Sequence, residues 1–222
     1  MNKKTFDTSN IGTFIIKDEE DLNFSKVILG SSSPRRIELL KGLVPNFKII
    51  KPDIDENMVI KDFFKENATG DFLKDSFSCC AKIALEKAKA VYQKDNSGLI
   101  ISADTIVCYK NQILGKPRDL NQASKTLISL LGDIHYICTG VCLLENHHKY
   151  KLYYQVSQVE FVEDGDFVNE FIRKYVQSKS PLDKAGSYNI QEVDRVLVSS
   201  IYGDYYNIVG LPLPELIRSL KL

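Results

Sequence analysis

The 222-residue chain carries 29 acidic and 29 basic side chains, so its formal net charge at pH 7 is zero. This balance excludes the strong positive field that draws a whole protein to nucleic acid or to anionic membranes, so a cationic site has to be local. With 44% hydrophobic residues, a chain of this length can bury a sizeable core, as one domain or as two lobes that share a sheet. We therefore expect neither a nucleic acid polymer nor a membrane among its partners.

Neither a membrane span nor a secretory signal is predicted. The longest apolar runs, such as 99–107, are too short to cross a bilayer, and the first residues lack an apolar stretch with a cleavage site. The five cysteines are an odd number without CxxC spacing, which is typical of core residues in a reducing compartment and argues against zinc. We expect a cytoplasmic protein with an appended N-terminal arm at residues 1–25 and one main domain at residues 26–222.

The first predicted element of that domain is a buried strand at 27–29, followed by a polar turn and a helix. Ser33 suits the N-cap, a proline follows it, and apolar residues at helical spacing continue to Leu43. The turn directs backbone N–H groups, serine hydroxyls and the guanidinium groups of Arg35 and Arg36 to one point, where a helix N-terminus favours an anion. The alternative is an ordinary strand–helix junction with solvated arginines, because Ser-Pro caps are common.

A second short strand is predicted at 47–50, and an acidic loop follows at 53–57. Three carboxylates after a strand end can hold a hard cation, although such loops are usually solvated connections. We predict irregular structure for residues 58–71 and a helix over 76–93. Lys87 borders the apolar stripe of that helix, and by itself it is typical of a lysine whose stem packs while its ammonium reaches water.

The central strand is predicted at 99–109, and Asp104 interrupts its apolar run. A carboxylate there is costly to bury without a partner or a metal, so it has to reach a cleft or a compensating donor. Asp104 is the strongest single candidate for chemistry, and the alternative is an aspartate bonded to a neighbouring turn. After a hairpin turn at 110–112 the chain returns to Lys116, which we expect at a strand exit close to Asp104.

The rest of the chain continues to interleave helices and strands. The further predicted elements are a helix capped by Asp119 or Asn121, a long hairpin of strands 136–144 and 150–161, a helix capped by Asp164 or Asp166, a polar loop at 180–191, a hairpin of strands 196–201 and 205–209, and a closing helix around 216–220. Because hairpins interrupt the alternation of strand and helix, we expect an α/β fold with a mixed sheet and flanking helices.

Charged residues of both signs stand at the ends or borders of these elements. The cations are Arg35, Arg36, Lys87 and Lys116, and the carboxylates are Glu56 and Asp104. An enzyme that cuts a nucleoside triphosphate needs cations to neutralise phosphoryl charge and carboxylates to hold Mg²⁺ or to orient the attacking water. The set is therefore consistent with phosphoanhydride chemistry.

Five segments resemble the Maf family of nucleoside triphosphate pyrophosphatases, in the family's order. They are SSSPRR at 31–36, ADT at 103–105, GKPRD at 115–119, LDKAGSYNIQ at 182–191 and VGLPL at 209–213. Five matches in order are far more specific than any one of them. The resemblance implies a twisted mixed sheet with flanking helices, two lobes around a cleft, an architecture like that of inosine triphosphate pyrophosphatase, and a homodimer.

The resemblance also implies a reaction. Water attacks the α-phosphorus of a nucleoside triphosphate, which releases a nucleoside monophosphate and pyrophosphate with the help of Mg²⁺ or Mn²⁺. Asp104, Glu56 and Lys116 would serve catalysis, with Asp104 as general base or metal-linked catalytic carboxylate and with Asp104 and Glu56 as metal ligands. The implied substrate-binding residues are Ser31, Ser33, Arg35, Arg36 and Lys87, together with Gln191 for the base.

The segments SPRR, ADT and IQ resemble the branch of the family that acts on dTTP and UTP, in a house-cleaning role for the nucleotide pool. Where the family usually has GxYGIQG, this chain has GSYNIQE, so that Asn189 and Glu192 replace two glycines and alter either the base pocket or only the turn. The alternatives are a non-catalytic nucleotide-binding regulator of cell division, a purine (ITP or XTP) pyrophosphatase and a 7-methyl-GTP pyrophosphatase. Retention of the cations and of Asp104 favours catalysis.

Overall fold

The computed structural model describes residues 8–19, 22 and 25–222. Helices are labelled α, 3-10 helices η and strands β. In chain order the elements are η1 (Thr8–Asn10), β1 (Gly12–Lys17), β2 (Val27–Gly30), α1 (Pro34–Lys41), β3 (Lys48–Ile49), α2 (Glu56–Asn67), α3 (Phe72–Lys94), β4 (Leu99–Tyr109), β5 (Gln112–Leu114), α4 (Leu120–Leu130), β6 (Ile134–Leu144), β7 (Tyr150–Phe161), α5 (Asp166–Gln177), η2 (Ser180–Asp183), η3 (Ala185–Ser187), α6 (Ile190–Leu197), β8 (Val198–Tyr202), α7 (Tyr205–Val209) and α8 (Leu213–Leu220).

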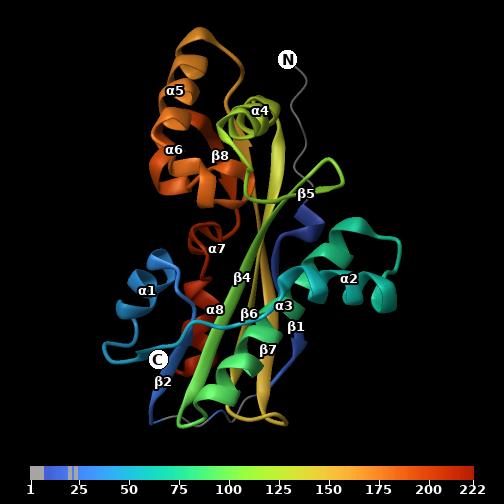
Figure 1. The fold of residues 1–222 in the computed structure, drawn as a ribbon, viewed down its shortest axis with the longest axis vertical. Helices are drawn as coiled ribbons and strands as arrows, with labels where there is room; N and C mark the ends of the chain where they lie inside the picture. Colours follow the sequence, from blue (N-terminus) through green and yellow to red (C-terminus); the bar gives the residue numbers. More distant parts are fainter. Residues whose placement is uncertain (1–7, 20–21, 23–24) are drawn as a thin grey trace.

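The strands of the described residues form one mixed, eight-stranded sheet, which confirms the predicted fold class (Figure 1). Along the sheet the order is β1-β7-β6-β4-β2-β3, with β5 paired to β4 and β8 paired to β7. Strand β2 runs parallel to β3 and to β4, and the other pairs are antiparallel. The long strands β4, β6 and β7 were all predicted, because their apolar, β-branched runs are typical of strands buried on both faces.

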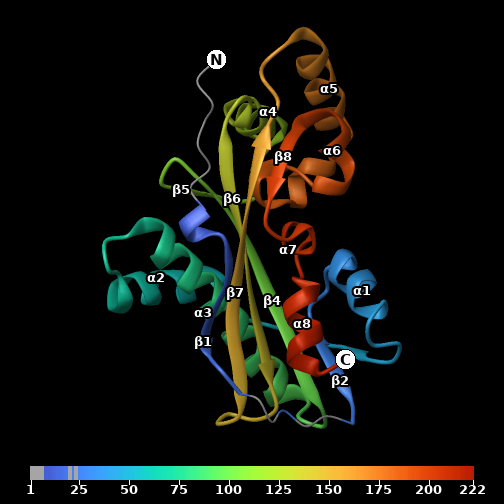
Figure 2. The same ribbon diagram turned by 180° about the vertical axis from the view of Figure 1, so that it is seen from behind.

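Helices cover both faces of this sheet. Helix α3 packs on one face, where Ile100 lies in its core cluster, while α1 and α8 pack on the other face against Ile101 (Figures 1 and 2). Successive residues of a strand point to opposite faces, so β4 contributes to both clusters. A third cluster at one end of the sheet contains side chains of α4, α5, α6 and α7. Strand β4 therefore runs through the centre of all three.

The region after the acidic loop differs from its prediction. Residues 56–67 form helix α2, so the irregular structure predicted for 58–71 was wrong over most of that range. Asp55 caps α2 by accepting a hydrogen bond from the backbone of Met58 at 3.1 Å. Helix α2 buries none of its residues, which explains why its sequence carries so weak a periodic signal. Helix α3 also begins earlier than predicted, at Phe72.

The predicted hairpin near the C-terminus was also wrong. Strand β8 pairs with the end of β7, while residues 205–209 form the short helix α7, whose N-cap is Asp204. Strand β7 thus forms the strand-pairing hydrogen bonds with β8 that the prediction had assigned to residues 205–209. The N-cap of α5 is Gly165, so neither Asp164 nor Asp166 caps that helix, whereas Asp119 caps α4 as predicted.

Residues 12–17 of the predicted N-terminal arm form β1, an edge strand that pairs antiparallel with β7. The ring of Phe14 stacks on that of Tyr154 at a centroid distance of 5.1 Å. The other part of the expected arm includes residues 1–7, 20–21 and 23–24, which lie outside the described residues. Within the described residues, no helix combines the length and the apolar composition that a membrane crossing needs.

Candidate active site

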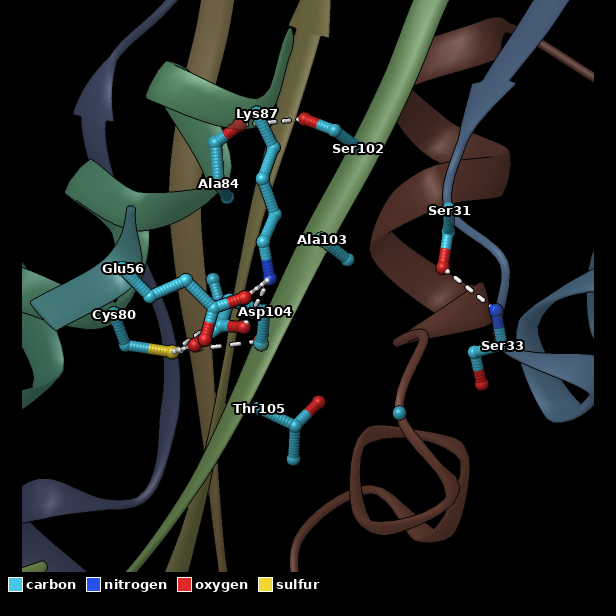
Figure 3. Close-up of polar contacts among 12 residues, drawn as sticks. Ser31, Ser33, Glu56, Cys80, Ala84, Lys87, Ser102, Ala103, Asp104 and Thr105 are labelled. Carbon is cyan, nitrogen blue, oxygen red and sulfur yellow. Dashed lines mark hydrogen bonds and ion pairs between the residues drawn. The ribbon is translucent and has the colours of Figure 1, made fainter. Parts of the chain in front are cut away.

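Asp104 lies in the middle of β4, and its carboxylate faces a lysine from α3 (Figure 3). Lys87 Nζ donates to Asp104 Oδ1 at 2.6 Å and lies 2.7 Å from Glu56 Oε1. Asp104 is 9% exposed and Lys87 is 8% exposed, whereas the side chain of Glu56 is half exposed at the start of α2. The structure therefore brings three of the predicted site residues together around one ammonium group.

Close packing of α3 on the sheet makes this contact possible. Gly140 of β6 lies opposite Asp104 in the register, and a Cβ atom there would come within 2.6 Å of the backbone of Ala81. Only glycine lets α3 approach so closely. The same approach buries Cys80, whose Sγ accepts the Gly140 N–H at 3.3 Å and lies 3.4 Å from the backbone oxygen of Asp104.

The ion pair explains how a buried strand tolerates a carboxylate. An aspartate in an apolar environment needs a compensating charge, and removal of one partner of a buried pair typically costs about 3–5 kcal/mol. Lys87 supplies that charge and keeps at least one of its three donors for another group. Glu56 adds a second carboxylate from a separate helix, so the cluster has two carboxylates for one ammonium group.

Arg36 is committed to the protein itself. Its Nη1 donates to the backbone oxygen of Ala103 at 2.7 Å, its Nη2 to Thr105 Oγ1 at 2.9 Å, and its Nε to the backbone oxygen of Gly210 at 2.8 Å. Burial lowers the pKa of Arg36 below its ordinary value, while the charge of Asp104 acts in the opposite direction. The guanidinium therefore fastens α1 and the α7–α8 turn to the two residues that flank Asp104.

Unlike Arg36, the cations Arg35 and Lys116 are not bonded to acceptors of the described residues. Both line the cleft, and neither forms a hydrogen bond or an ion pair within the described part of the chain. Ser33 is the N-cap of α1 as predicted, yet its hydroxyl makes no capping bond, and its N–H donates to Ser31 Oγ at 3.2 Å. These cations and hydroxyls are therefore available to an anion at the N-terminus of α1.

A cleft of about 920 Å³ connects these groups. Its lining includes eight of the nine predicted site residues, namely Ser31, Ser33, Arg35, Arg36, Glu56, Lys87, Asp104 and Lys116. Gln191 is exposed on α6 and is not part of the lining, so its role in base recognition stays a prediction. Its neighbours Asn189 and Glu192 do line the cleft.

Two further residues beside Asp104 or in the cleft were not predicted from the sequence. Lys184 is 8% exposed, lines the cleft, and donates to the Ser180 backbone oxygen at 2.6 Å and to Asp183 Oδ1 at 2.7 Å. Its position within the segment LDKAGSYNIQ was the available signal. Cys80 carried no signal, because a buried cysteine beside a carboxylate cannot be told from a core cysteine by spacing. All five cysteines are buried and free, as predicted.

The carboxylates are suited to a hard divalent cation. The described residues contain no group of three His, Cys, Asp or Glu side chains that could hold a metal by themselves. However, Mg²⁺ commonly takes only one or two carboxylates and completes its octahedron with water and substrate phosphates. Asp104 and Glu56 already share one cation, the Lys87 ammonium, so their oxygens face a common position.

Comparison with known proteins identifies the family. The model of the family described as Maf-like protein matches residues 26–222. A Bacillus cereus (strain B4264) protein named dTTP/UTP pyrophosphatase is 39% identical over 196 residues, which cover 88% of this chain and 94% of that protein. A Bacillus anthracis protein of the same name has the same identity and coverage. The solved structure of the Staphylococcus aureus Ham1 protein matches with a TM-score of 0.40 and 13% identity, over 64% of this chain and 74% of that one.

Proposed function

This chain belongs to the Maf-like protein family, and from that membership we propose that it hydrolyses nucleoside triphosphates, with dTTP and UTP as substrates, to a nucleoside monophosphate and pyrophosphate. The name shared by the Bacillus relatives supports this substrate choice. The observation that carries the reaction is the buried pair of Asp104 and Lys87, which opens onto a cleft that also holds the uncommitted cations Arg35 and Lys116.

The triphosphate would bind at the N-terminus of α1. There the free Ser33 hydroxyl, the backbone N–H groups of the first turn and the Arg35 guanidinium can all donate to phosphate oxygens. Lys116 adds charge from the end of the β4–β5 hairpin. Arg36, which is already bonded to three acceptors, would instead hold this turn against β4.

Asp104 would act as the general base. Lys87 binds its Oδ1, and Oδ2 lies 3.9 Å from Cys80 Sγ, which leaves it one lone pair to take a proton from water. The water oxygen then forms a bond to the α-phosphorus while the bond from that phosphorus to the bridging oxygen breaks, and pyrophosphate leaves with both electrons. Arg35 and Lys116 would stabilise the negative charge that grows on the departing phosphates.

We also propose that a divalent cation, Mg²⁺ or Mn²⁺, assists the reaction. Held by Asp104 and Glu56 together with phosphate oxygens, the cation would supply positive charge to the phosphoryl group. Lys87 would then orient both carboxylates through its two short contacts. The two carboxylates and the resemblance of the sequence to a metal-dependent family support this part of the proposal.

The assembly and location of the protein are proposed as well. We propose a homodimer, as the resemblance implies, and a cytoplasmic protein. The family model starts at residue 26, and β1 of the preceding segment joins the same sheet. The five free cysteines are consistent with a reducing compartment.

A nucleotide panel tests the proposed reaction. Purified protein is incubated with each NTP and dNTP and with Mg²⁺ or Mn²⁺, and the products are separated by ion-exchange chromatography. We expect UMP and dTMP with pyrophosphate. A diphosphate with orthophosphate would overturn the proposed cleavage position, and tight binding without hydrolysis over hours would favour a regulatory nucleotide binder. A preference for ITP or XTP would assign the protein to purine nucleotides instead.

A further inference from the structure

Two polar side chains stand together in the cleft at the start of α6. Asn189 is the N-cap of α6 and Glu192 lies in its first turn, and both line the cleft. Asn189 Nδ2 donates to Glu192 Oε1 at 3.1 Å. Neither residue takes part in the proposed chemistry.

The Glu192 carboxylate is fixed in orientation. Besides Asn189, Ser180 donates its hydroxyl to Oε2 at 2.6 Å, and the Tyr175 hydroxyl forms a further hydrogen bond with the carboxylate. Partial burial acts to raise the pKa of Glu192, but these hydrogen bonds outweigh burial and lower the pKa below its ordinary value. Glu192 is therefore ionised at neutral pH, and its three protein donors leave about one of its four acceptor positions open.

An ionised carboxylate restricts what can lie beside it. A phosphate group would be repelled, so the part of a bound nucleotide that faces Glu192 is the sugar or the base. A carboxylate only accepts hydrogen bonds, so that part must present a hydrogen. Asn189 adds a donor next to this acceptor, because Nδ2 carries two hydrogens and one of them binds Glu192. The neighbouring donor and acceptor match a base edge, where a carbonyl oxygen and a ring N–H stand side by side.

We propose that Asn189 and Glu192 form the base-reading pair of this enzyme, in which Glu192 accepts the ring N–H of uracil or thymine and Asn189 donates to an adjacent carbonyl. The inference rests on the proposed function. Uracil and thymine carry a hydrogen on ring atom N3, whereas cytosine carries a lone pair on the same atom, which the carboxylate repels. The pair thus favours bases that carry a ring N–H beside a carbonyl and disfavours CTP.

The substitution Glu192→Gln tests this pair, because it keeps the size of the side chain but replaces an acceptor oxygen by a donor. We expect the ratio of kcat/KM for UTP to that for CTP to fall about 10- to 100-fold, which is the value of a hydrogen bond to a charged group. The ratio for UTP to dUTP should stay unchanged. Glu66→Gln on the exposed face of α2 is the matched control, since it removes the same charge away from the cleft.

Three outcomes separate this inference from the proposed function. An unchanged UTP-to-CTP ratio in an active Glu192→Gln protein overturns the base-reading pair alone. A change in the UTP-to-dUTP ratio instead assigns Glu192 to the ribose and also overturns it. If the unmodified protein hydrolyses no nucleotide, the proposed reaction fails. The ratio of the dissociation constants for UTP and CTP, measured by calorimetry for both proteins, then still decides the inference.

Thermal unfolding confirms that each variant is folded. Asn189→Ala provides a second variant, for which we expect weaker UTP binding.

Discussion

Asp104 and Lys87 belong to long regular elements, whereas Asn189 and Glu192 belong to a segment of short turns at residues 180–192. The first pair lies on β4 and α3, is almost fully buried, and is held by the core of the sheet. The second pair follows two 3-10 helices, and in the second of these Gly186 and Ser187 adopt left-handed conformations, with φ of 68° and 65°. Local hydrogen bonds among side chains orient Asn189 and Glu192.

This difference in support matches the two functions proposed for the cleft, which are proton transfer at Asp104 and base recognition at Asn189 and Glu192. A general base has to be held in one place by elements that do not move, and a buried ion pair on a central strand provides this. Recognition of a base needs only a few side chains at the cleft surface, which can be exchanged without disturbing the core. Asn189 and Glu192 fit this description, because both side chains find partners within their own segment.

The largest effect is expected from Asp104→Asn. Loss of a general base lowers turnover by roughly 10²- to 10⁴-fold. The amide keeps the shape of the side chain, so UTP binding should change much less than kcat. Rapid-quench or steady-state kinetics with Mg²⁺ measures the loss, and Asp62→Asn on the exposed face of α2 is the control. Near-normal turnover in folded protein would remove Asp104 from the chemistry.

Lys87→Met tests how much the buried ion pair of Lys87 with Asp104 contributes to the stability of the protein. The methionine retains the apolar stem but leaves Asp104 without its ammonium partner, so we expect the free energy of unfolding to fall by about 3–5 kcal/mol. For a protein of this size that corresponds to a decrease in Tm of roughly 6–20 °C.

Lys82→Met is the matched control on the same helix. Its ammonium forms only a solvent-accessible pair with Glu86, so its loss should cost less than about 1 kcal/mol. Equal destabilisation by the two variants would contradict the assigned role of the Lys87–Asp104 pair.

Arg35 and Arg36 are adjacent in the sequence but differ in their contacts, so we expect their substitution to have different effects. Arg36→Lys removes a planar fork that reaches three acceptors in two segments, and a lysine cannot replace it, so we expect a loss of about 2 kcal/mol in stability. Arg35→Lys should leave stability within about 0.5 kcal/mol, because Arg35 makes no bond within the described residues, and should raise KM instead. Urea unfolding and steady-state kinetics of both variants measure the contrast. A KM effect confined to Arg36→Lys would reverse the two roles.

These arginines show what the sequence could and could not predict. The strand around Asp104 was predictable because a lone carboxylate in an apolar run has to find a partner. Lys87 remained ambiguous, since a lysine beside an apolar stripe usually reaches water. Arg36 was grouped with Arg35, because two of its three acceptors are backbone oxygens, one of which lies 174 residues away in the sequence.

The errors in secondary structure have a related cause. Residues 205–209 are apolar enough for a strand, but β8 already pairs with β7, and Asp204 offers an N-cap. Helix α2 buries no residue, so hydrophobic periodicity could not reveal it. Where local pattern and tertiary pairing agree, as in β4, β6 and β7, the prediction was correct. Where a distant partner decides the outcome, the sequence carries little local signal.

A pH-dependent effect is expected from the residue that supports the 180–192 segment. His135 is completely buried on β6, and its Nε2 lies 2.7 Å from the hydroxyl of Tyr188, which lines the cleft. Burial lowers the pKa of His135 to about 3, so the folded protein keeps the imidazole neutral. In the unfolded chain the same group titrates near pH 6.5. The unfolded state therefore binds the additional proton between these two values.

Stability should consequently fall as the pH decreases below about 6.5. The contribution of one such group approaches 1.4 kcal/mol per pH unit, or about 2 kcal/mol at pH 5. His135→Gln cannot take up this proton, and its amide can still bond to Tyr188. We therefore expect the difference in unfolding free energy between the original protein and the variant to shift in favour of the variant by about that amount from pH 7 to pH 5. Urea unfolding at each pH measures the shift, and parallel curves for the two proteins would show that His135 is protonated equally in both states.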